Sequence, residues 1–250
     1  MLWCFIKLRR FGMVVCLSGA LTATAGAQQL PPAMPRFEIR WTDYAAIGVL
    51  GTAAVLPTLL ADHLPHATCA PCDPSGLWGI DRGTIGEPRS GPAAASDVTL
   101  LATFFGGAAL LAHARAGQPS QAKWEDVTVY TQSVLATAAV TEWTKVLFQR
   151  PRPPRYTANA ANYLDPDYGK SFPSGHAAFS FAAASSYASI LSQRGEAGRH
   201  KGEIVLLFTT AAATSILRVS AHKHFPTDVM AGAVLGTTVG WFVPRIHRTQ

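Results

Sequence analysis

Six apolar stretches, separated by Pro, Gly and charged residues, occupy most of the chain beyond residue 43. They are rich in Ala, Leu and Gly, and they lack the strict alternation of apolar and polar residues that a half-buried strand shows. No strand pattern of comparable length competes with them, so the sequence predicts an all-α fold, a six-helix bundle. The stretches are Tyr44 to Ala61, Val98 to Ala114, Val127 to Leu147, Ala177 to Leu191, Ile204 to Leu217 and Val229 to Val243.

The composition favours a bundle that lies in a membrane. Hydrophobic residues make up 48% of the 250 residues and charged residues only 14%, more apolar than an ordinary soluble surface requires. Spanning a bilayer takes about 20 apolar residues, so Tyr44 to Ala61 qualifies and Ile204 to Leu217 alone does not. Gly232, Gly236 and Gly240 recur every fourth position, a spacing that lets membrane helices approach closely. A tightly packed, soluble exported bundle is the alternative.

The start of the chain has the pattern of a secretory signal. A basic beginning, an apolar stretch and the small residues Ala25-Gly26-Ala27 follow one another before Gln28. We therefore divide the chain into a signal peptide at 1–27, a lead at 28–42 and a helical domain at 43–250, with an uncleaved anchor as the alternative. Removing residues 1–27 lowers the formal charge from +6 to +3, which gives no support to a nucleic-acid partner.

Two cysteines remain after the signal, Cys69 and Cys72, in a proline-rich segment. In an exported protein such a pair indicates a local disulfide that stiffens a loop, and less often a redox or metal site. A zinc site would need two more ligands. His63 and His66 are near, but their spacing is not typical of one.

Charge placement predicts which way the bundle faces. Basic residues tend to stay on the cytoplasmic side of a membrane protein. They gather in the connection from Arg194 to Glu203 and in the tail at Arg245 and Arg248. The chain would then lie in the bacterial inner membrane, with its reactive segments on the exported, periplasmic side. Counting back through six spans places Arg40 inside, which conflicts with a cleaved signal that leaves residue 28 outside.

The first reactive segment holds Lys145 and Arg152. They are seven residues apart, two helical turns, and Pro151 ends the helix between them, so Arg152 lies on the loop at its mouth. A lysine supplies a point charge and an arginine a flat fork of donors, a combination suited to phosphate oxygens. A basic cluster at a membrane edge, with Arg150 and Arg155, is the competing interpretation.

The second segment is Pro173-Ser174-Gly175-His176, which opens the next apolar helix. Unpaired backbone N–H groups and the helix dipole favour an anion there. Ser174 can cap the helix or donate to a phosphate oxygen, Gly175 allows close approach of the backbone, and His176 can protonate a leaving oxygen. An ordinary helix cap is the alternative.

The third segment combines Arg218, His224 and Asp228. His224 and Asp228 lie four apart around Pro226, so we expect the carboxylate to accept a hydrogen bond from one imidazole nitrogen and leave the other free to attack. That arrangement favours a histidine nucleophile. His222 lies six residues from Asp228, and we interpret it as a surface or supporting residue.

The joint order of the three segments is specific. Lys-x6-Arg-Pro, Pro-Ser-Gly-His and Arg-x5-His-x3-Asp resemble the signature of the type 2 phosphatidic acid phosphatase and vanadium haloperoxidase superfamily. The match covers Lys145 to Asp228, and the helical layout extends it to about 43–243. One position departs from the family pattern, since Leu217 stands where a serine usually precedes the arginine.

The resemblance implies a role for each matching residue. Five would hold the phosphate: Lys145, Arg152, Ser174, Gly175 and Arg218. His224 would be the nucleophile, His176 the general acid and Asp228 the partner that orients His224. Water would then hydrolyse the phosphohistidine, and the family requires no metal and no other cofactor for this reaction.

Several functions follow as hypotheses. The first is a phosphatase that acts on a lipid or polyprenyl phosphate or diphosphate at the membrane, since apolar helices around a cationic site suit a charged head and an oily tail. A soluble exported acid phosphatase of broad range is the nearest alternative. A vanadate-dependent haloperoxidase would use the same cations. A non-enzymatic anion-binding protein would not need His176, His224 and Asp228.

Overall fold

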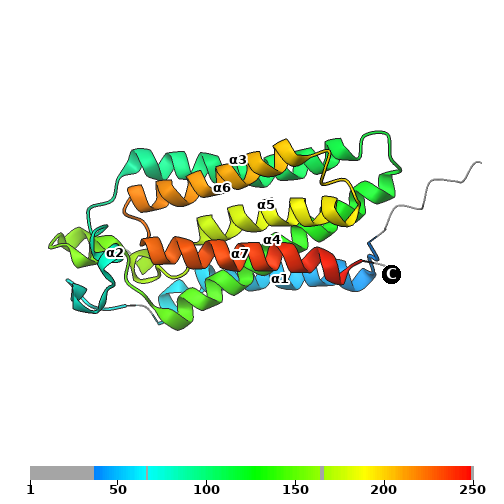
Figure 1. Ribbon diagram of the computed structural model, residues 1–250. Coiled ribbons are helices and arrows are strands. Elements are labelled where there is room, and N and C mark those ends of the chain that lie inside the picture. Colours follow the sequence, from blue (N-terminus) through cyan, green and yellow to red (C-terminus); the bar gives the residue numbers. More distant parts are fainter. Residues whose placement is uncertain (1–36, 66, 164–165, 249–250) are drawn as a thin grey trace, which may run out of the picture. The chain divides into compact units, whose positions relative to one another are not determined.

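The computed structural model describes residues 37–65, 67–163 and 166–248. Over these residues it is all-helical, and each predicted apolar stretch corresponds to one long helix (Figure 1). The all-α prediction is thus confirmed, with one short helix, α2 (Gly79–Arg82), in addition. The predicted signal peptide lies outside the described residues. The long helices are α1 (Trp41–Leu59), α3 (Ser90–Ala114), α4 (Ser120–Phe148), α5 (Gly175–Gln193), α6 (Lys201–Ser220) and α7 (Pro226–Ile246).

The three reactive segments coincide with helix ends. Helix α4 ends at Phe148, and Gln149 follows in the left-handed region with φ 47°. Helix α5 begins directly after its N-cap, Ser174. Helix α7 begins with Pro226, the position at which proline's missing N–H costs nothing. The local sequence therefore places the predicted site residues at helix ends, where backbone N–H and C=O groups lack partners within the helix.

Helix α5 is the centre of the bundle and packs against α3, α4, α6 and α7. Its contact with α7 is the closest, because Gly236 of α7 lies directly over the backbone of α5. A Cβ atom at position 236 would be 2.0 Å from the carbonyl oxygen of Ala178. Gly232 and Gly240 meet the same helix one turn to either side. The close approach predicted from the glycine spacing is confirmed, and it keeps the starts of α5 and α7 adjacent.

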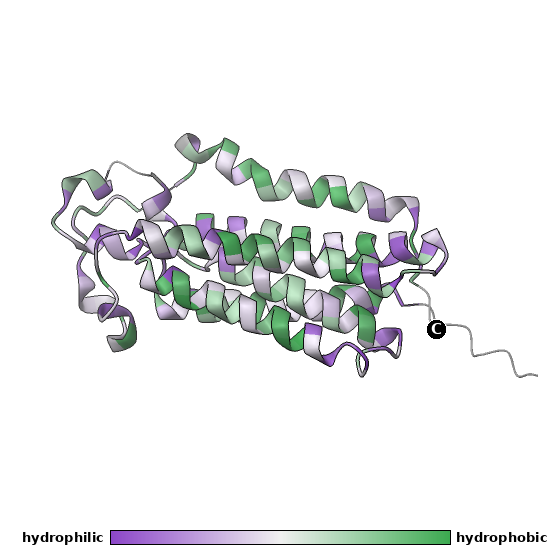
Figure 2. Ribbon diagram, turned by 90° about the horizontal axis from the view of Figure 1, so that it is seen from above, coloured by the Kyte–Doolittle hydropathy of each residue, from purple (hydrophilic) through white to green (hydrophobic). Residues whose placement is uncertain are grey.

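Four of the described helices are long and apolar enough to cross a membrane: α1, α3, α6 and α7. Helix α6 qualifies because it extends three residues beyond each end of the apolar stretch Ile204 to Leu217. Apolar residues line the helices and hydrophilic residues gather at both ends (Figure 2). These features support a membrane location.

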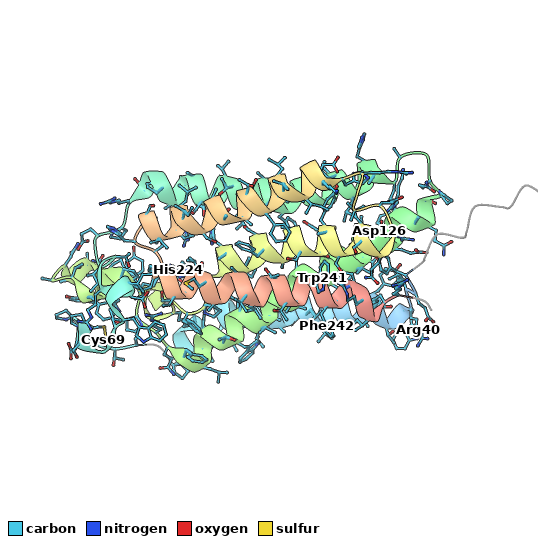
Figure 3. The ribbon with its side chains drawn as sticks, viewed as in Figure 1. Arg40, Cys69, Asp126, His224, Trp241 and Phe242 are labelled. Atoms are coloured by element: carbon cyan, nitrogen blue, oxygen red, sulfur yellow. A yellow bond between two sulfur atoms is a disulfide. The ribbon has the colours of Figure 1, made fainter. Side chains whose placement is uncertain are left out.

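The two ends of the bundle have different chemistry. Phe37 and Arg248 pair at one end, where the described chain starts and finishes. A buried ion network lies at this end, in which Asp126 binds both Arg115 at 2.6 Å and Arg194 at 2.5 Å. Figure 3 places Asp126 and Arg40 at this end and His224 at the other. The reactive segments thus meet at the end away from the basic connection after α5.

Candidate active site

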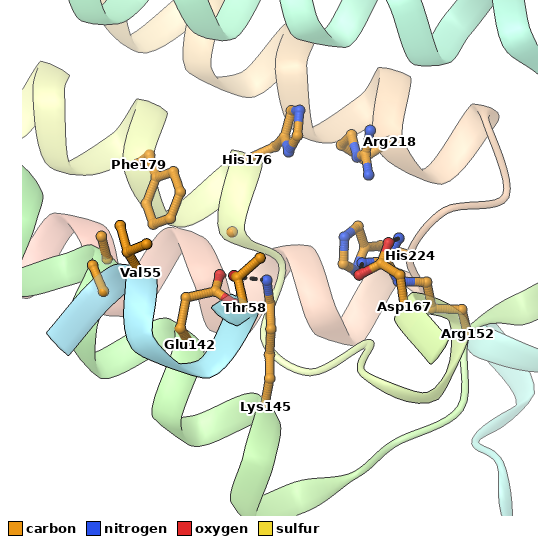
Figure 4. A pocket seen from close by; sticks show the side chains of 13 residues that line it. Val55, Thr58, Glu142, Lys145, Arg152, Asp167, His176, Phe179, Arg218 and His224 are labelled. Carbon is orange, nitrogen blue, oxygen red and sulfur yellow. Dashed lines mark hydrogen bonds and ion pairs between the residues drawn. The ribbon is translucent and has the colours of Figure 1, made fainter. Parts of the chain in front are cut away.

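The three reactive segments converge on one cavity of about 540 Å³ (Figure 4). Six of the eight predicted site residues line it: Lys145, Arg152, Gly175, His176, Arg218 and His224. Ser174 and Asp228 do not line it, and both are fully buried behind it. The cavity also has apolar walls from α1, α4 and α5.

Lys145 and Arg152 enter the cavity from the end of α4 and the loop that follows. Both are buried, and each is paired with a carboxylate. Lys145 Nζ lies 2.6 Å from Glu142, and the Arg152 guanidinium grips Asp167 with two contacts of 2.7 and 2.9 Å. The bidentate geometry is the one that an arginine also offers to a phosphate.

Arg218 reaches the cavity from the last turn of α6. Its Nη1 atom donates to Ser96 at 3.3 Å and lies 3.8 Å from Asp97. The Nε atoms of Arg218 and Arg152 are buried without a hydrogen-bond partner among the described residues. An unsatisfied buried donor costs about 1–3 kcal/mol. Both arginines line the cavity, so they present cationic groups to an anion there.

Ser174 and Gly175 form the start of α5 beneath this cluster. Ser174 caps the helix, since its Oγ accepts from the N–H of Ala177 at 3.5 Å. A Cβ atom at Gly175 would lie 3.4 Å from Lys145 Nζ, so glycine leaves the space beside this cation open. Of the two roles considered for Ser174, the structure shows the cap.

His176 has an acidic partner that the sequence pattern does not reveal. Its Nε2 atom lies 2.6 Å from Asp97 Oδ1, on α3, 79 residues away in the chain. Burial first, and then the positive charge of Arg218, lower the pKa of His176 to about 4, while the hydrogen bond to Asp97 acts in the opposite direction. His176 is therefore neutral near pH 7.

His224 lies in the turn between α6 and α7 and is 1% exposed. Its Nδ1 atom is 2.9 Å from the carbonyl oxygen of Ser171, so Nδ1 carries the proton and donates it. Nε2 is then the unprotonated nitrogen, in the ring that lines the cavity. Burial first, and then the charges of Arg152 and Arg218, hold the pKa of His224 well below its usual range. The imidazole thus keeps a lone pair for reaction.

The prediction that Asp228 accepts a hydrogen bond directly from His224 is wrong. Asp228 Oδ2 is 3.7 Å from His224 Nδ1, close enough for electrostatic contact but not for a hydrogen bond. Asp228 is the third residue of α7, and its carboxylate caps its own helix by accepting from the N–H of Phe225 at 2.9 Å. It also accepts from Ser171 Oγ at 2.5 Å. Asp228 therefore orients His224 indirectly, by holding Ser171.

Arg150 is a supporting residue that sequence reasoning assigned only to a basic cluster. It donates to Asp228 at 2.6 Å and to Asp81, on α2, at 2.8 Å. Asp81 in turn accepts from the N–H and hydroxyl groups of Thr227. This network ties α2, the loop after α4 and the start of α7 together. Asp81 lies 69 residues before Arg150, and no local pattern links them.

Cys69 and Cys72 form a disulfide with Cα atoms 4.8 Å apart. Figure 3 places Cys69 at the same end as His224. The N–H of Cys72 donates to the carbonyl oxygen of Arg155, which attaches this loop to the segment after Arg152. The two sulfurs are bonded to each other, so they are not available as the thiolates that zinc needs.

The fold and the cavity together define a helical bundle with a cationic, histidine-containing anion site at one end. The chain belongs to the PAP2 superfamily, whose family model matches residues 126–250. It is also similar to Lipid phosphate phosphatase 1 of Arabidopsis thaliana, with 32% identity over 136 residues, a match that covers 45% of this chain. The match spans 42% of that protein's length, less than half. No solved structure matches the chain.

Proposed function

We propose that the chain is a phosphatase that hydrolyses a lipid phosphate through a phosphohistidine on His224. One observation carries this proposal. A buried, neutral imidazole, with its proton held on Nδ1 by Ser171, lines a cavity that also contains three cations. A non-enzymatic anion site would need the cations but would not need an oriented nucleophile.

The first step is attack of His224 Nε2 on phosphorus. The N–P bond forms while the ester P–O bond breaks, and the leaving oxygen takes a proton from His176. Lys145, Arg152 and Arg218 stabilise the charge on the transferred group, the main task in phosphoryl transfer. The phosphate would displace the carboxylates of Glu142 and Asp167 from their cations. Its negative charge would favour protonation of His176, against the burial and the nearby cations that lower the pKa of this group.

The second step returns the enzyme to its starting state. Water attacks phosphorus, the P–N bond breaks and the proton of the water passes to His176. Inorganic phosphate leaves and His224 regains its lone pair. Three fixed cations at the site support a reaction that is independent of a metal ion, since they supply the charge that a metal supplies in other phosphatases.

The substrate class and the location are also proposals. The name of the Arabidopsis relative and the apolar walls of the cavity support a lipid phosphate, with a polyprenyl phosphate or diphosphate as a related choice. Arg194 is the C-cap of α5 and Arg245 lies in the last turn of α7, whereas the site lies at the starts of these two helices. Because basic residues favour the cytoplasmic side, we propose that the site lies on the exported, periplasmic face of a bacterial inner membrane. With α1 crossing the membrane, that orientation puts Arg40, the N-cap of α1, on the cytoplasmic side.

A substrate panel tests the function. The full chain in detergent should release inorganic phosphate from phosphatidic acid, from a polyprenyl diphosphate and, more slowly, from p-nitrophenyl phosphate. Addition of EDTA should leave the rates unchanged. Release that stops with EDTA and returns with Mg²⁺ would contradict the metal-independent mechanism, and no release from any ester would contradict the assignment as a phosphatase.

Replacing Asp97 by asparagine should shift the pH profile of the reaction. Asp97 raises the pKa of His176, so its loss lowers that pKa further, by about one unit for an adjacent opposite charge. His176 must be protonated to act as the acid. The alkaline limb of the plot of kcat against pH should therefore move to lower pH. The measurement uses an alkyl phosphate, whose alkoxide is a poor leaving group and needs the proton from His176.

Two comparisons make the Asp97 result specific. The variant Asp97→Glu should restore much of the profile, and p-nitrophenyl phosphate, whose leaving group needs little protonation, should be affected less. An equal fall in kcat at every pH and with both substrates would show that Asp97 acts only on folding.

A further inference from the structure

A second, smaller cavity of about 220 Å³ adjoins the active site. Glu142, Lys145 and Asp167 line both cavities, so the two carboxylates that pair with cations of the site lie at the boundary between them. The smaller cavity contains one more charged side chain, Lys170, which the proposed reaction does not use. Two kinds of partner can reach Lys170 there: a carboxylate at this boundary or an anion that enters the cavity.

Lys170 is a buried cation without an ion-pair partner. It is 9% exposed, and no carboxylate among residues 37–65, 67–163 and 166–248 lies within ion-pair distance of its ammonium group. Its N–H donates to the carbonyl oxygen of Asp167 at 3.2 Å, at the end of the 3₁₀ turn Pro166–Gly169. Side chains three residues apart lie on the same face of such a turn. A buried charge is stabilised by an opposite charge, and Asp167 is the carboxylate that the turn brings to it.

Asp167 is paired with the phosphate site instead. The Arg152 guanidinium holds its carboxylate with contacts of 2.7 and 2.9 Å, and Figure 4 shows this pair on the same side of the cavity as His224. These are the donors that would grip a phosphate. The Asp167 side chain is 60% exposed, so the carboxylate can rotate away from Arg152 without repacking of the core. Asp167 is therefore an internal competitor of phosphate for Arg152.

Charge decides which anion suits Lys170. When phosphate takes Arg152, Asp167 loses its partner beside a group with a charge of about −1.5 to −2 at pH 7. Glu142 loses Lys145 in the same way. A second anion from the substrate would enter the smaller cavity against both carboxylates, whereas Asp167 needs only a rotation of its side chain to leave the phosphate and approach Lys170. The smaller cavity is thus better suited to receive Asp167 than to bind a second phosphate.

We propose that Asp167 and Lys170 form a carboxylate switch at the phosphate site. Asp167 pairs with Arg152 in the free enzyme, moves to Lys170 when phosphate binds, and returns to Arg152 as inorganic phosphate leaves. Lys170 is a positioning residue, because it acts on phosphate affinity only through Asp167. This inference rests on the proposed function and adds to it the means by which a site with three cations releases its anionic product.

Binding of inorganic phosphate tests the switch without turnover. Equilibrium dialysis of radiolabelled phosphate against the full chain in detergent gives Kd. Asp167→Asn removes the competitor and should lower Kd about tenfold, the scale of a hydrogen-bonded ion pair. Lys170→Met removes the second partner of Asp167 and should raise Kd about fivefold, the scale of a partly exposed ion pair. In the Asp167→Asn background, Lys170→Met should change Kd by less than about twofold, because the carboxylate that Lys170 receives is gone.

Two further variants make this result specific. Lys170→Arg keeps the charge and should bind phosphate like wild type. Lys223 is the matched control for net charge: its charge also acts on Asp167, but it contacts the ring and the hydroxyl group of Tyr168 and lines neither cavity. Lys223→Met should change Kd by the same factor with and without Asp167→Asn. With p-nitrophenyl phosphate, Lys170→Met should raise KM and leave kcat within about twofold, whereas a damaged fold would lower kcat.

The outcomes separate the switch from the proposed function. An equal rise of Kd for Lys170→Met in both backgrounds would overturn the switch and make Lys170 a direct ligand of phosphate. An unchanged Kd in Asp167→Asn would also overturn it, since the carboxylate would then not compete. Coupling between the two residues in a chain that releases phosphate from no ester would support the switch and contradict the phosphatase. A chain that binds no phosphate would contradict both.

Discussion

Replacing His224 by alanine should abolish phosphate release from every substrate, with kcat lowered about ten-thousand-fold or more, the scale of a lost nucleophile. The imidazole is the only side chain in the proposed scheme that forms a bond to phosphorus. The cations would remain, so substrate should still bind, and KM should change far less than kcat. Release of inorganic phosphate, assayed in the same detergent as wild type, measures the effect.

A trapping experiment connects this loss to the intermediate. Wild type quenched during turnover of a radiolabelled substrate should carry phosphate that is stable to base and released by acid, as a phosphohistidine is. His224→Ala should carry none. His222→Asn is the matched control, because His222 is adjacent, contacts the carbonyl oxygen of Glu87 and has a positive φ of 55° that asparagine tolerates.

Three results would contradict the assignment. Label that persists in His224→Ala would place the intermediate on another residue. Activity that survives in His224→Ala with a normal kcat would show that no covalent step occurs there. A loss in His222→Asn as large as the loss in His224→Ala would mean that the turn, and not the imidazole, is what the substitution disturbs.

Replacing Gly236 by alanine should be the most destabilising single-methyl change in the bundle. The added Cβ would lie 2.0 Å from the carbonyl oxygen of Ala178, and the backbone of α5 cannot move aside as a flexible side chain could. Overpacking of this kind costs about 1–3 kcal/mol, and a backbone clash belongs at the upper end. The N–H of Ser174 donates to the carbonyl oxygen of Asp228 at 3.0 Å, so separating α5 from α7 also disturbs the site.

Thermal unfolding in detergent and phosphate release measure this second prediction together. Both the unfolding temperature and kcat should fall in Gly236→Ala. Gly106→Ala is the matched control: Gly106 is also within a long helix, α3, but an added Cβ there meets no atom within 4 Å. It should be neutral or slightly stabilising, because alanine favours helix over glycine. Equal unfolding temperatures for both variants would mean that α5 and α7 tolerate separation.

The sequence predicted which side chains lie near helix ends wherever the residues are close together in the chain. Lys145 and Arg152, the start of α5, and the pair Arg218 and His224 each lie within a few residues of a helix end. Helix ends can be predicted from proline, glycine and capping residues. The free backbone N–H groups at a helix N-terminus bind anions. The periodic glycines of α7 likewise indicated close packing before any partner helix was known.

The remaining site residues were not predictable in this way. Asp97 reaches His176 across 79 positions and Asp81 reaches Arg150 across 69, so only folding brings these charges together. Asp228 shows the same limit at short range. Its spacing to His224 suggested a direct hydrogen bond, but the carboxylate caps its own helix and leaves Ser171 to hold the imidazole.

The sequence alone determined the helices, their ends and the set of reactive groups, because apolar periodicity, helix capping and motif spacing are local properties of a chain. The tertiary structure decided how these groups are paired and what surrounds them. His176 and His224 face one cavity because α5 packs closely on α7 through Gly236, and α4, the loop after it and α6 bring three cations to the same cavity. The apolar side of that cavity exists because α1 packs on α4 and brings Val55 to the same cavity as Phe179 of α5. Both depend on packing between distant segments, which no local pattern encodes.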